Sequence, residues 1–187
     1  MIKVTIDDKE LEVADGTMII EAADNNGIPI PRFCYHKKLS IAANCRMCLV
    51  EVNKIPKALP ACATPVTDGM IVKTKSTKAI SAQKAVMECW LSNHPLDCPI
   101  CDQGGECELQ DLSVEYGKDT SRFNEQKIVV EDQNIGSLVQ TDMTRCILCT
   151  RCIRFGEEVA GMRELGTIGR GAFTQISTFV EKNLDSE

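Results

Sequence analysis

Four potential metal ligands lie close together in one segment of the chain. The imidazole of His94 and the thiols of Cys98, Cys101 and Cys107 are separated by three, two and five residues. Two prolines and two adjacent glycines in the same segment disfavour regular helix or strand, so we expect the chain to wrap as a loop. One His and three Cys suit tetrahedral zinc, and they also suit an iron–sulfur cluster. The segment alone leaves both possibilities open.

A second set of thiols precedes this loop. Cys34, Cys45, Cys48 and Cys62 are separated by ten, two and thirteen residues. Four thiolates on the loops at the edge of a small sheet are typical of a plant-type 2Fe–2S site, although the first separation here is longer than in that pattern. The alternative is a zinc ribbon, which usually has two close cysteine pairs. This set contains one such pair, which favours the 2Fe–2S cluster.

A third set lies nearer the end of the sequence. Cys146, Cys149 and Cys152 are separated by two and two residues, which is the spacing of a bacterial-ferredoxin-type 4Fe–4S loop. Zinc rarely uses three cysteines spaced so tightly. Two other residues of ligand type fit no set. Cys89 is interpreted as a small apolar core residue of a helix, and His36 is expected on a solvated loop.

Composition limits the class of protein. The chain has 187 residues, 43% of them hydrophobic but only 4% aromatic, and eleven cysteines. That cysteine count is odd, and Met1 leads directly into a strand-like stretch instead of a secretion segment, so metal-bound thiolates in a reducing compartment are favoured over disulfides. A net charge of −6 argues against nucleic acid as the main ligand. No apolar run is long enough to span a membrane, so membrane association is expected only through partners.

The N-terminal elements should position the four-cysteine set. Residues Ile2–Ile6 alternate between apolar and polar, as a half-buried strand does, and Leu11–Val13 continue the pattern after a turn at Asp8–Lys9. Thr17 is expected to cap a short helix that Asn25–Gly27 ends. A hairpin followed by a crossing helix is how a ferredoxin-type β-grasp domain begins.

The later elements should position the other two sets. We expect a helix over residues 76–92, capped by Ser76 or Thr77, which leads to His94, and an amphipathic helical segment over residues 109–116 ended by Gly117. Further strands are predicted at Leu49–Val52, Met70–Val72, Ile128–Val130, Thr167–Gly171 and Phe173–Val180.

These elements predict an α+β chain with three domains. Residues 1–76 are expected to form a β-grasp, 2Fe–2S ferredoxin-like domain. Residues 77–118 are expected to form a small helical domain with the site of one His and three Cys. Residues 119–187 are expected to form a 4Fe–4S ferredoxin-like segment that is incomplete, because no fourth cysteine follows Cys152.

Three ligand sets in one chain indicate a series of redox centres. No Ser–His–Asp set, glycine-rich phosphate loop or carboxylate pair near a histidine suggests a catalytic residue, so the chain is expected to carry electrons. Basic residues accompany the ligands: Arg46, Arg145, Arg151 and Arg154. A cation ~4 Å from an anionic cluster contributes about 4 kcal/mol at an effective dielectric near 20, enough to change its potential. The alternative for each arginine is an ordinary solvated charge.

Together, the three spacings resemble a known family. The sequence is similar, from Met1 to Glu187, to the N-terminal iron–sulfur region of the large peripheral-arm subunit of respiratory complex I, the NADH:quinone oxidoreductase. The resemblance implies one 2Fe–2S cluster and one or two 4Fe–4S clusters. The implied ligands are Cys34, Cys45, Cys48 and Cys62 for the 2Fe–2S cluster, His94, Cys98, Cys101 and Cys107 for the first 4Fe–4S cluster, and Cys146, Cys149 and Cys152 for the second.

The resemblance also implies partners and a location. Electrons would arrive from NADH through an FMN-bearing partner subunit and leave toward quinone. The location would be the matrix side of the mitochondrial inner membrane, or the cytoplasmic face of a bacterial plasma membrane. The family carries a fourth cysteine beyond the position of Cys152 and a long molybdopterin-oxidoreductase-like region, both absent here. We therefore expect a fragment, or a split subunit completed by another polypeptide.

Two other functions remain open from the sequence. The electron-input arm of an iron-only hydrogenase or an NAD-linked formate dehydrogenase shares the first two sets, but such arms usually continue with a ferredoxin motif that ends in Cys-Pro, which is missing here. A structural zinc protein that serves as an interaction module is the alternative from a different class. Such a protein would be colourless when purified anaerobically.

Overall fold

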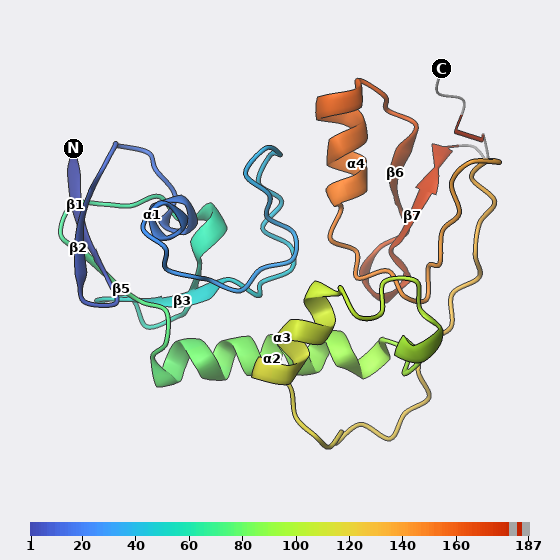
Figure 1. The fold of residues 1–187 in the computed structure, drawn as a ribbon, viewed down its shortest axis with the longest axis horizontal. Coiled ribbons are helices and arrows are strands. Elements are labelled where there is room, and N and C mark those ends of the chain that lie inside the picture. The colour runs from blue at the N-terminus through green and yellow to red at the C-terminus, as the bar shows by residue number, and fades with distance from the viewer. Residues whose placement is uncertain (180–182, 185–187) are drawn as a thin grey trace.

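The computed structural model describes residues 1–179 and 183–184. A mixed sheet occupies the N-terminal end of the molecule, and a two-stranded sheet with a helix beside it occupies the other end (Figure 1). The long helix α2 (Thr77–Asn93) runs along one side between these ends, with α3 (Glu108–Tyr116) packed on it. This arrangement is the α+β architecture expected from the sequence.

The larger sheet has five strands in the order β2-β1-β5-β3-β4. Its strands are β1 (Ile2–Ile6), β2 (Lys9–Val13), β5 (Met70–Lys73), β3 (Leu49–Val52) and β4 (Leu59–Pro60). The pairing of β1 with β5 is parallel and joins the two ends of the domain, whereas the other pairs are antiparallel. The predicted strands over residues 2–6, 11–13, 49–52 and 70–72 are thus confirmed.

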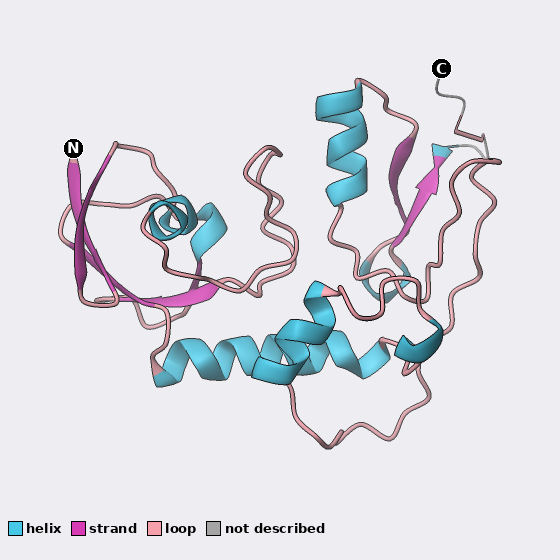
Figure 2. Cartoon of the chain, viewed as in Figure 1, coloured by secondary structure: helices cyan, strands magenta, loops and turns pink. Residues whose placement is uncertain are grey.

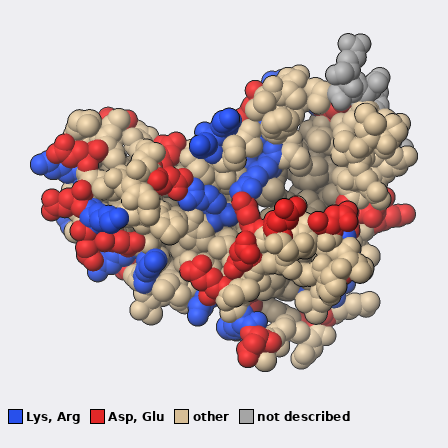
Figure 3. Space-filling model, viewed as in Figure 1, with Lys and Arg blue, Asp and Glu red and all other residues tan. Residues whose placement is uncertain are grey.

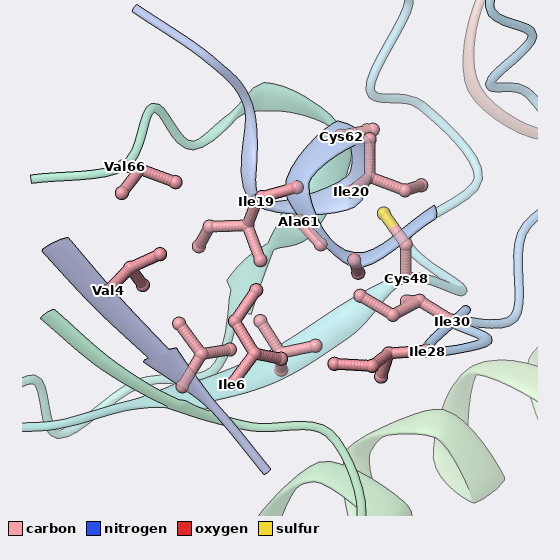
Figure 4. Close-up of a cluster of buried hydrophobic side chains, with 14 of the residues drawn as sticks. Val4, Ile6, Ile19, Ile20, Ile28, Ile30, Cys48, Ala61, Cys62 and Val66 are labelled. Atoms are coloured by element: carbon pink, nitrogen blue, oxygen red, sulfur yellow. The ribbon is translucent and has the colours of Figure 1, made fainter. Parts of the chain in front are cut away.

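Helix α1 (Ile19–Asn25) crosses the sheet and closes its core. Ile19 and Ile20 are fully buried in one cluster with Val4 and Ile6 from β1, and Ile20 lies on the side of Cys48 and Cys62 (Figure 4). Burying one such side chain contributes roughly 1.5–3 kcal/mol. Cys48 and Cys62 lie at the edge of the same cluster, so the core that stabilises the sheet also fixes two of the predicted ligands.

Two local predictions were wrong by one residue. The β1–β2 turn lies at Asp7 and Asp8, with φ of 44° and 68°, and not at Asp8–Lys9. A tight hairpin turn of this hand needs positive φ at both central residues, and aspartate tolerates it. Helix α1 is capped by Met18 and not by Thr17, because the Glu21 carboxylate accepts a hydrogen bond from the Met18 backbone N–H (3.1 Å).

Helix α2 begins and ends where the sequence predicts. The Ser76 hydroxyl accepts a hydrogen bond from the Ala79 N–H (3.2 Å), as a serine N-cap does. The helix is tied to the sheet by Gln83, whose buried Nε2 donates to the Leu49 carbonyl (2.9 Å). It ends at His94, where extended backbone replaces helical backbone, so the first ligand of the second set stands at a helix terminus.

The C-terminal part consists of α4 (Arg151–Phe155), a following π-helical turn (Gly156–Ala160), and the strands β6 (Leu165–Ile168) and β7 (Gln175–Thr178) (Figure 2). The strands pair in antiparallel register from Leu165–Thr178 to Ile168–Gln175. The predicted strand pair is therefore confirmed, but its limits differ: the first strand begins at Leu165 and not at Thr167, a 3-10 turn occupies Gly171–Phe173, and the second strand is shorter than predicted. Residue 180 of the prediction lies outside the described residues.

Three expectations were wrong. Residues 128–130 form no strand, and Val129 is 79% exposed, because the apolar triplet finds no partner strand. Val114 of α3 is exposed, so the apolar face of that helix is narrower than predicted. Cys89 is exposed on α2 and is not a core residue. In the described part of the chain, no helix is long and apolar enough to cross a membrane.

A second apolar cluster joins the three parts. Its fully buried members are Phe33, Cys34, Cys45, Met47, Met87 and Leu109. Phe33 and Trp90 meet edge to face with ring centroids 6.3 Å apart, and the Trp90 indole N–H donates to the Cys45 carbonyl (3.2 Å). This cluster attaches the first ligand loop to α2. We call it the central cluster.

Candidate metal centres

The four cysteines of the first set come together in the structure. Cys34, Cys45, Cys48 and Cys62 are all buried, at 3% exposed or less. Each comes from a loop, a turn or a short 3-10 helix beside the sheet, as the sequence predicts. The Cys34 backbone N–H donates to the Cys45 Sγ over 3.4 Å. The structure thus places four thiols together in the interior of the protein.

The thiols of the first set interact with one another, and Cys34 contacts both Cys45 and Cys62. Hydrogen bonds from neighbouring thiols lower the pKa of Cys34, with Cys45 the main partner, and lower the pKa of Cys48, with Cys62 the main partner. The pKa values of Cys45 and Cys62 are raised, because each thiol gives its hydrogen bond to a neighbour that ionises first. Four buried thiolates repel one another unless cationic metal lies between them. This donor set therefore fits a metal centre.

The backbone around the ligands takes an unusual conformation. Arg46, between Cys45 and Cys48, has a φ of 58°, and Leu148 and Thr150, between the cysteines of the third set, have φ of 51° and 59°. Such left-handed residues turn successive N–H groups toward one concave side, which binds anions and sulfide clusters. The Leu148 N–H, for example, donates to the Cys146 Sγ (3.4 Å). Nothing in these residue types indicated this conformation from the sequence.

The second set lies on the predicted loop between α2 and α3. Cys98 is exposed, whereas Cys101 and Cys107 are half-buried. The Cys101 N–H donates to the Cys98 carbonyl (3.2 Å), and the Gly104 N–H donates to the Cys101 carbonyl (2.9 Å). A Cβ atom on Gly104 would lie 2.6 Å from the Cys98 carbonyl oxygen, so only glycine allows the loop to close this tightly.

His94 is positioned to act as a neutral ligand. Burial lowers its pKa, because the charged imidazolium loses its hydration. Its neighbour Asp97 is held by Arg145, whose Nε and Nη2 donate to Asp97 Oδ2 over 2.9 and 2.8 Å. Arg145 also pairs with Asp142 (2.9 Å). This bridge connects the second ligand loop to the segment that carries the third set.

The third set begins next to His94. His94 and Cys146 line one cavity of about 330 Å³ between α2 and the C-terminal part. The exposed Cys89 lines the same cavity, so it stands near two predicted ligand sets although it belongs to neither. Cys149 packs against the central cluster, and burial raises the pKa of Cys146. Cys152 lies in the first turn of α4 and is exposed.

Two arginines of the third set reach back to the first. Arg151 donates to the Glu108 carboxylate (3.0 Å) and to the Tyr35 carbonyl (3.2 Å). Arg154 is buried and donates to the Cys34 and Ser40 carbonyls (2.5 and 2.6 Å). Figure 3 shows basic side chains gathered where the loop after α1 approaches α4. The sequence placed these arginines near the third set only, because their contacts with Tyr35, Cys34 and Ser40 are more than 100 residues away in the sequence.

His36 and Arg46 lie on the protein surface. His36 is exposed, and its Nδ1 accepts a hydrogen bond from the Lys38 N–H (3.2 Å), as expected of a solvated loop. Arg46 is exposed. Within residues 1–179 and 183–184, no three His, Cys, Asp or Glu side chains converge as they would around a single metal ion. The first set instead forms one series of thiol contacts that runs from Cys45 through Cys34 and Cys62 to Cys48.

Family comparison divides the chain in the same way as the ligand sets. Residues 1–77 match a 2Fe-2S iron-sulfur cluster binding domain. Residues 83–122 match the NADH-ubiquinone oxidoreductase-G iron-sulfur binding region, and residues 136–187 match the ferredoxin-like domain of NADH-quinone oxidoreductase subunit 3. The fold and these matches define an iron–sulfur protein with 2Fe–2S and 4Fe–4S binding domains.

Curated relatives identify the family more closely. The chain is 56% identical to the mitochondrial 78 kDa subunit of NADH-ubiquinone oxidoreductase from Neurospora crassa and 57% identical to the 75 kDa subunit from Reclinomonas americana. It is 53% identical to a subunit of NADH-quinone oxidoreductase from Rickettsia bellii. All of the chain aligns, with 25%, 27% and 28% of these relatives. The whole chain is thus similar to part of this complex I subunit, and it spans about a quarter of the length of these relatives.

A solved structure shows the same fold in another enzyme. The crystal structure of an NAD+-reducing [NiFe]-hydrogenase in the H2-reduced state contains a chain that superposes with a TM-score of 0.87 at 28% identity. The match covers 95% of this chain and 75% of that chain. The arrangement of the parts is therefore shared beyond the family of the complex I subunit.

Proposed function

We propose that this chain is an electron relay of NADH:quinone oxidoreductase, and that three ligand sets hold its clusters. Cys34, Cys45, Cys48 and Cys62 hold a 2Fe–2S cluster, and His94, Cys98, Cys101 and Cys107 hold a 4Fe–4S cluster. Cys146, Cys149 and Cys152 hold a second 4Fe–4S cluster, whose fourth ligand is not in these sets. The chain itself has no substrate-converting site, and its enzymatic role is that of a subunit.

The central cluster is the observation that carries this proposal. Cys34 and Cys45 of the first set are buried in it, and Cys107 of the second set and Cys149 of the third pack against it. One apolar body thus touches a ligand of every set. Short separations through dry protein are what an electron relay requires, whereas three independent structural metal sites have no reason to share one core.

The protein residues hold the centres and exclude water. When bound, the clusters accept and release single electrons. The buried first set keeps its centre in a medium of low dielectric, where nearby charges act strongly. The lowered pKa of His94 keeps the imidazole neutral, which metal coordination requires. Cys98 and Cys152 are exposed, so the second and third centres lie closer to the surface of this chain.

Three domains follow from this assignment: residues 1–76, 77–118 and 119–187. The proposed partners are the other peripheral-arm subunits of complex I, including the FMN-bearing subunit that oxidises NADH, and the polypeptide with the remaining three quarters of the family's length. The chain would associate peripherally with the membrane-bound complex, on the matrix side in mitochondria or the cytoplasmic side in bacteria. Neither nucleic acid binding nor membrane insertion is proposed.

The second candidate is the electron-input arm of an NAD-linked hydrogenase. The 28% identity and TM-score of 0.87 to a chain of the NAD+-reducing [NiFe]-hydrogenase favour it. The identities of 53–57% to the NADH-quinone and NADH-ubiquinone oxidoreductase relatives favour complex I more strongly. The two candidates share the chemistry of this region and differ in their partners. Affinity purification from the native source would yield quinone-reductase subunits in one case and hydrogenase subunits in the other.

Metal analysis of the anaerobically purified chain tests the chemistry. We expect about two plus four irons from the first two sets and about ten irons if the third is complete, with matching acid-labile sulfide. Cys34→Ser should remove the 2Fe–2S signal from the EPR spectrum and leave the signals of the other centres. Cys89→Ser is the matched control and should change none of them. A preparation that contains mainly zinc would overturn the proposal.

A further inference from the structure

Arg154 is the one arginine beside the ligand sets that is buried without an ion pair in the described residues. Only 8% of its surface is exposed. Arg145 pairs with Asp97 and Asp142, and Arg151 pairs with Glu108. No ion pair in residues 1–179 and 183–184 includes Arg154. Its charge is therefore not neutralised by a carboxylate in contact.

The guanidinium group of Arg154 joins the backbones of two ligand sets. Its Nη2 donates to the carbonyl of Cys34 (2.5 Å) and to the carbonyl of Cys149 (3.2 Å). Its Nη1 donates to the carbonyl of Ser40 (2.6 Å), and its Nε donates to the hydroxyl of Thr150 (3.4 Å). One side chain thus holds the loop of the first set against the loop of the third.

Carbonyl dipoles alone are poor compensation for a buried cation. A charge removed from water is costly unless an opposite charge lies close by. The nearest acidic side chain on the same segment, Glu158, binds the Ser40 N–H and hydroxyl instead. Glu158 still lies close enough for its carboxylate to interact electrostatically with the guanidinium group. The thiolates of the two sets, which carry excess negative charge when they hold iron, are the other groups that can balance the charge.

We propose that Arg154 is a positioning residue that sets the potentials of the first and third centres together, by placing one permanent positive charge between them. This inference rests on the proposed function, because it requires iron–sulfur centres at both sets. A positive charge favours the reduced, more negative state of a centre. Removal of the charge therefore makes each centre harder to reduce.

The sign of the shift in reduction potential distinguishes an electrostatic role of Arg154 from a role in packing alone. If Arg154 only held the two loops together, its loss would open the sites to water. Water stabilises the more negative reduced state, so the potentials would rise. Loss of the charge without opening lowers them. The two explanations thus predict shifts of opposite sign in the same measurement.

The test compares four variants of the 187-residue chain by anaerobic redox titration monitored by EPR. Arg154→Met and Arg154→Gln remove the charge, and Arg154→Lys keeps it. Arg163→Met is the control, because Arg163 belongs to the same part of the chain but is exposed and pairs with Glu157. The decisive signal is that of the centre at Cys34, whose ligand set is complete.

We expect either neutral variant to lower the ratio of reduced to oxidised first centre about tenfold at a given ambient potential, or 59 mV for one electron. Arg154→Lys should change this ratio less than about threefold, and Arg163→Met should not change it. The third centre should shift in the same direction. An unchanged or raised potential in a neutral variant that keeps its iron overturns the proposal.

Loss of iron from the Arg154 variants would also test the proposal. If both neutral variants lose iron while Arg154→Lys retains it, the charge is indispensable and the proposal is supported. If Arg154→Lys loses iron as well, the hydrogen-bonding fork is the essential feature and the proposal is overturned. Wild-type chain without iron and sulfide would refute the proposed function itself. Wild-type centres with unshifted variants refute only the role of Arg154.

Discussion

Single residues in the ligand loops carry backbone strain that serves the sites. Arg46, Leu148 and Thr150 adopt positive φ although none is glycine. Each such residue costs roughly 1–3 kcal/mol and persists only where its surroundings require it. At Leu148 the strain has a visible use, because its N–H donates to the Cys146 Sγ (3.4 Å).

Arg46 offers a clean test of this strain. Asparagine tolerates a left-handed backbone, whereas a β-branched residue does not. We expect Arg46→Val to lower the free energy of unfolding by about 1–3 kcal/mol and to weaken cluster retention. Arg46→Asn removes the same exposed charge and should leave both nearly unchanged. Denaturant unfolding and iron content measure the two effects. Equal stabilities of these two variants would contradict the assignment of strain to residue 46.

As a proposed ligand, His94 would determine the charge of the second centre. A neutral imidazole in place of a thiolate makes a cluster less negative and easier to reduce, as in Rieske centres. We expect His94→Cys to keep a cluster and to lower its potential by on the order of 100 mV. Redox titration by EPR checks this shift, with Cys89→Ser as the control. If no centre changes its potential in the variant, His94 is not a ligand.

At the scale of elements, helix α2 connects the sheet to the second set. It starts at Ser76, is tied to β3 through Gln83, and ends at His94. The position of the second ligand loop therefore depends on the stability of this helix. Its start depends mainly on one capping hydroxyl.

We expect Ser76→Ala to lower the free energy of unfolding by about 1 kcal/mol, because the first turn of α2 loses its N-cap. Ser92→Ala is the matched control. Its hydroxyl donates only to the Cys89 carbonyl in the last turn (2.7 Å), so its effect should stay within about 0.5 kcal/mol. Thermal or denaturant unfolding compares the two. Equal losses would mean that the cap does not limit the helix.

The contact between the first ligand loop and α4 should depend on pH. The Glu158 carboxylate accepts hydrogen bonds from the Ser40 hydroxyl and N–H (the latter 2.8 Å), which hold its pKa below the usual 4.5. A lowered folded-state pKa means that the contact is complete above about pH 4.5. It is lost as the pH falls through the folded-state value.

Hydrogen exchange at the Ser40 amide should follow this titration, after correction for the intrinsic pH dependence of exchange. Glu158→Gln should leave the amide less protected at neutral pH and remove the additional loss in acid. The variant Glu157→Gln, next in the chain, should behave as wild type. Protection that persists in Glu158→Gln would show that other contacts hold the loop.

Many of the strands and helices that carry the ligand loops could be predicted, because each has a clear local pattern of apolar and polar residues. The alternation in residues 2–6 and the capped apolar pattern of residues 76–92 each require one structure. The strand predicted at Ile128–Val130 was wrong, because three consecutive apolar residues show no alternation and indicate no partner strand. Cys89 misled because a cysteine inside a helix can face either side, and the face depends on what packs against it.

The spacing of the cysteines predicts which residues form each ligand set, but it does not predict how the sets are arranged in space. Spacing grouped the cysteines of each set. The bridge made by Arg154 joins residues 120 positions apart, and the cavity shared by His94 and Cys146 depends on how α2 meets the C-terminal part. Such neighbours arise from tertiary packing, which no local pattern encodes.

At the scale of the whole molecule, the third set is the least complete. It offers three thiols, and the sequence has no cysteine after Cys152. Two nearby side chains could have supplied a fourth ligand. Asp142 is engaged by Arg145, and Cys89 only shares a cavity with Cys146. The open iron of a three-thiolate cube is therefore expected to be labile.

We expect the purified chain to lose iron from the third centre first, and to retain it when a polypeptide with the remainder of the family's length is co-expressed. Time-resolved iron release under air, with EPR of each centre, measures the order. The control is the first centre, whose four thiols are buried. A stable four-iron third centre in the 187-residue chain alone would contradict this expectation and point to Cys89, which Cys89→Ser would then test.

The parallel pairing of β1 with β5 has a consequence for biosynthesis. These strands are the first and last of the sheet in sequence, and every cysteine of the first set lies between them. The pocket that holds the four cysteines therefore cannot form until residue 73 has emerged from the ribosome. Once β5 has emerged, all four cysteines are available, although Cys34 and Cys45 are covered by Met87, Trp90 and Leu109 only when α2 and α3 follow. N-terminal domains generally fold first during synthesis. We expect the first set to be ready for iron and sulfide delivery during translation, while the third set waits for Arg154 to reach a loop that is already formed.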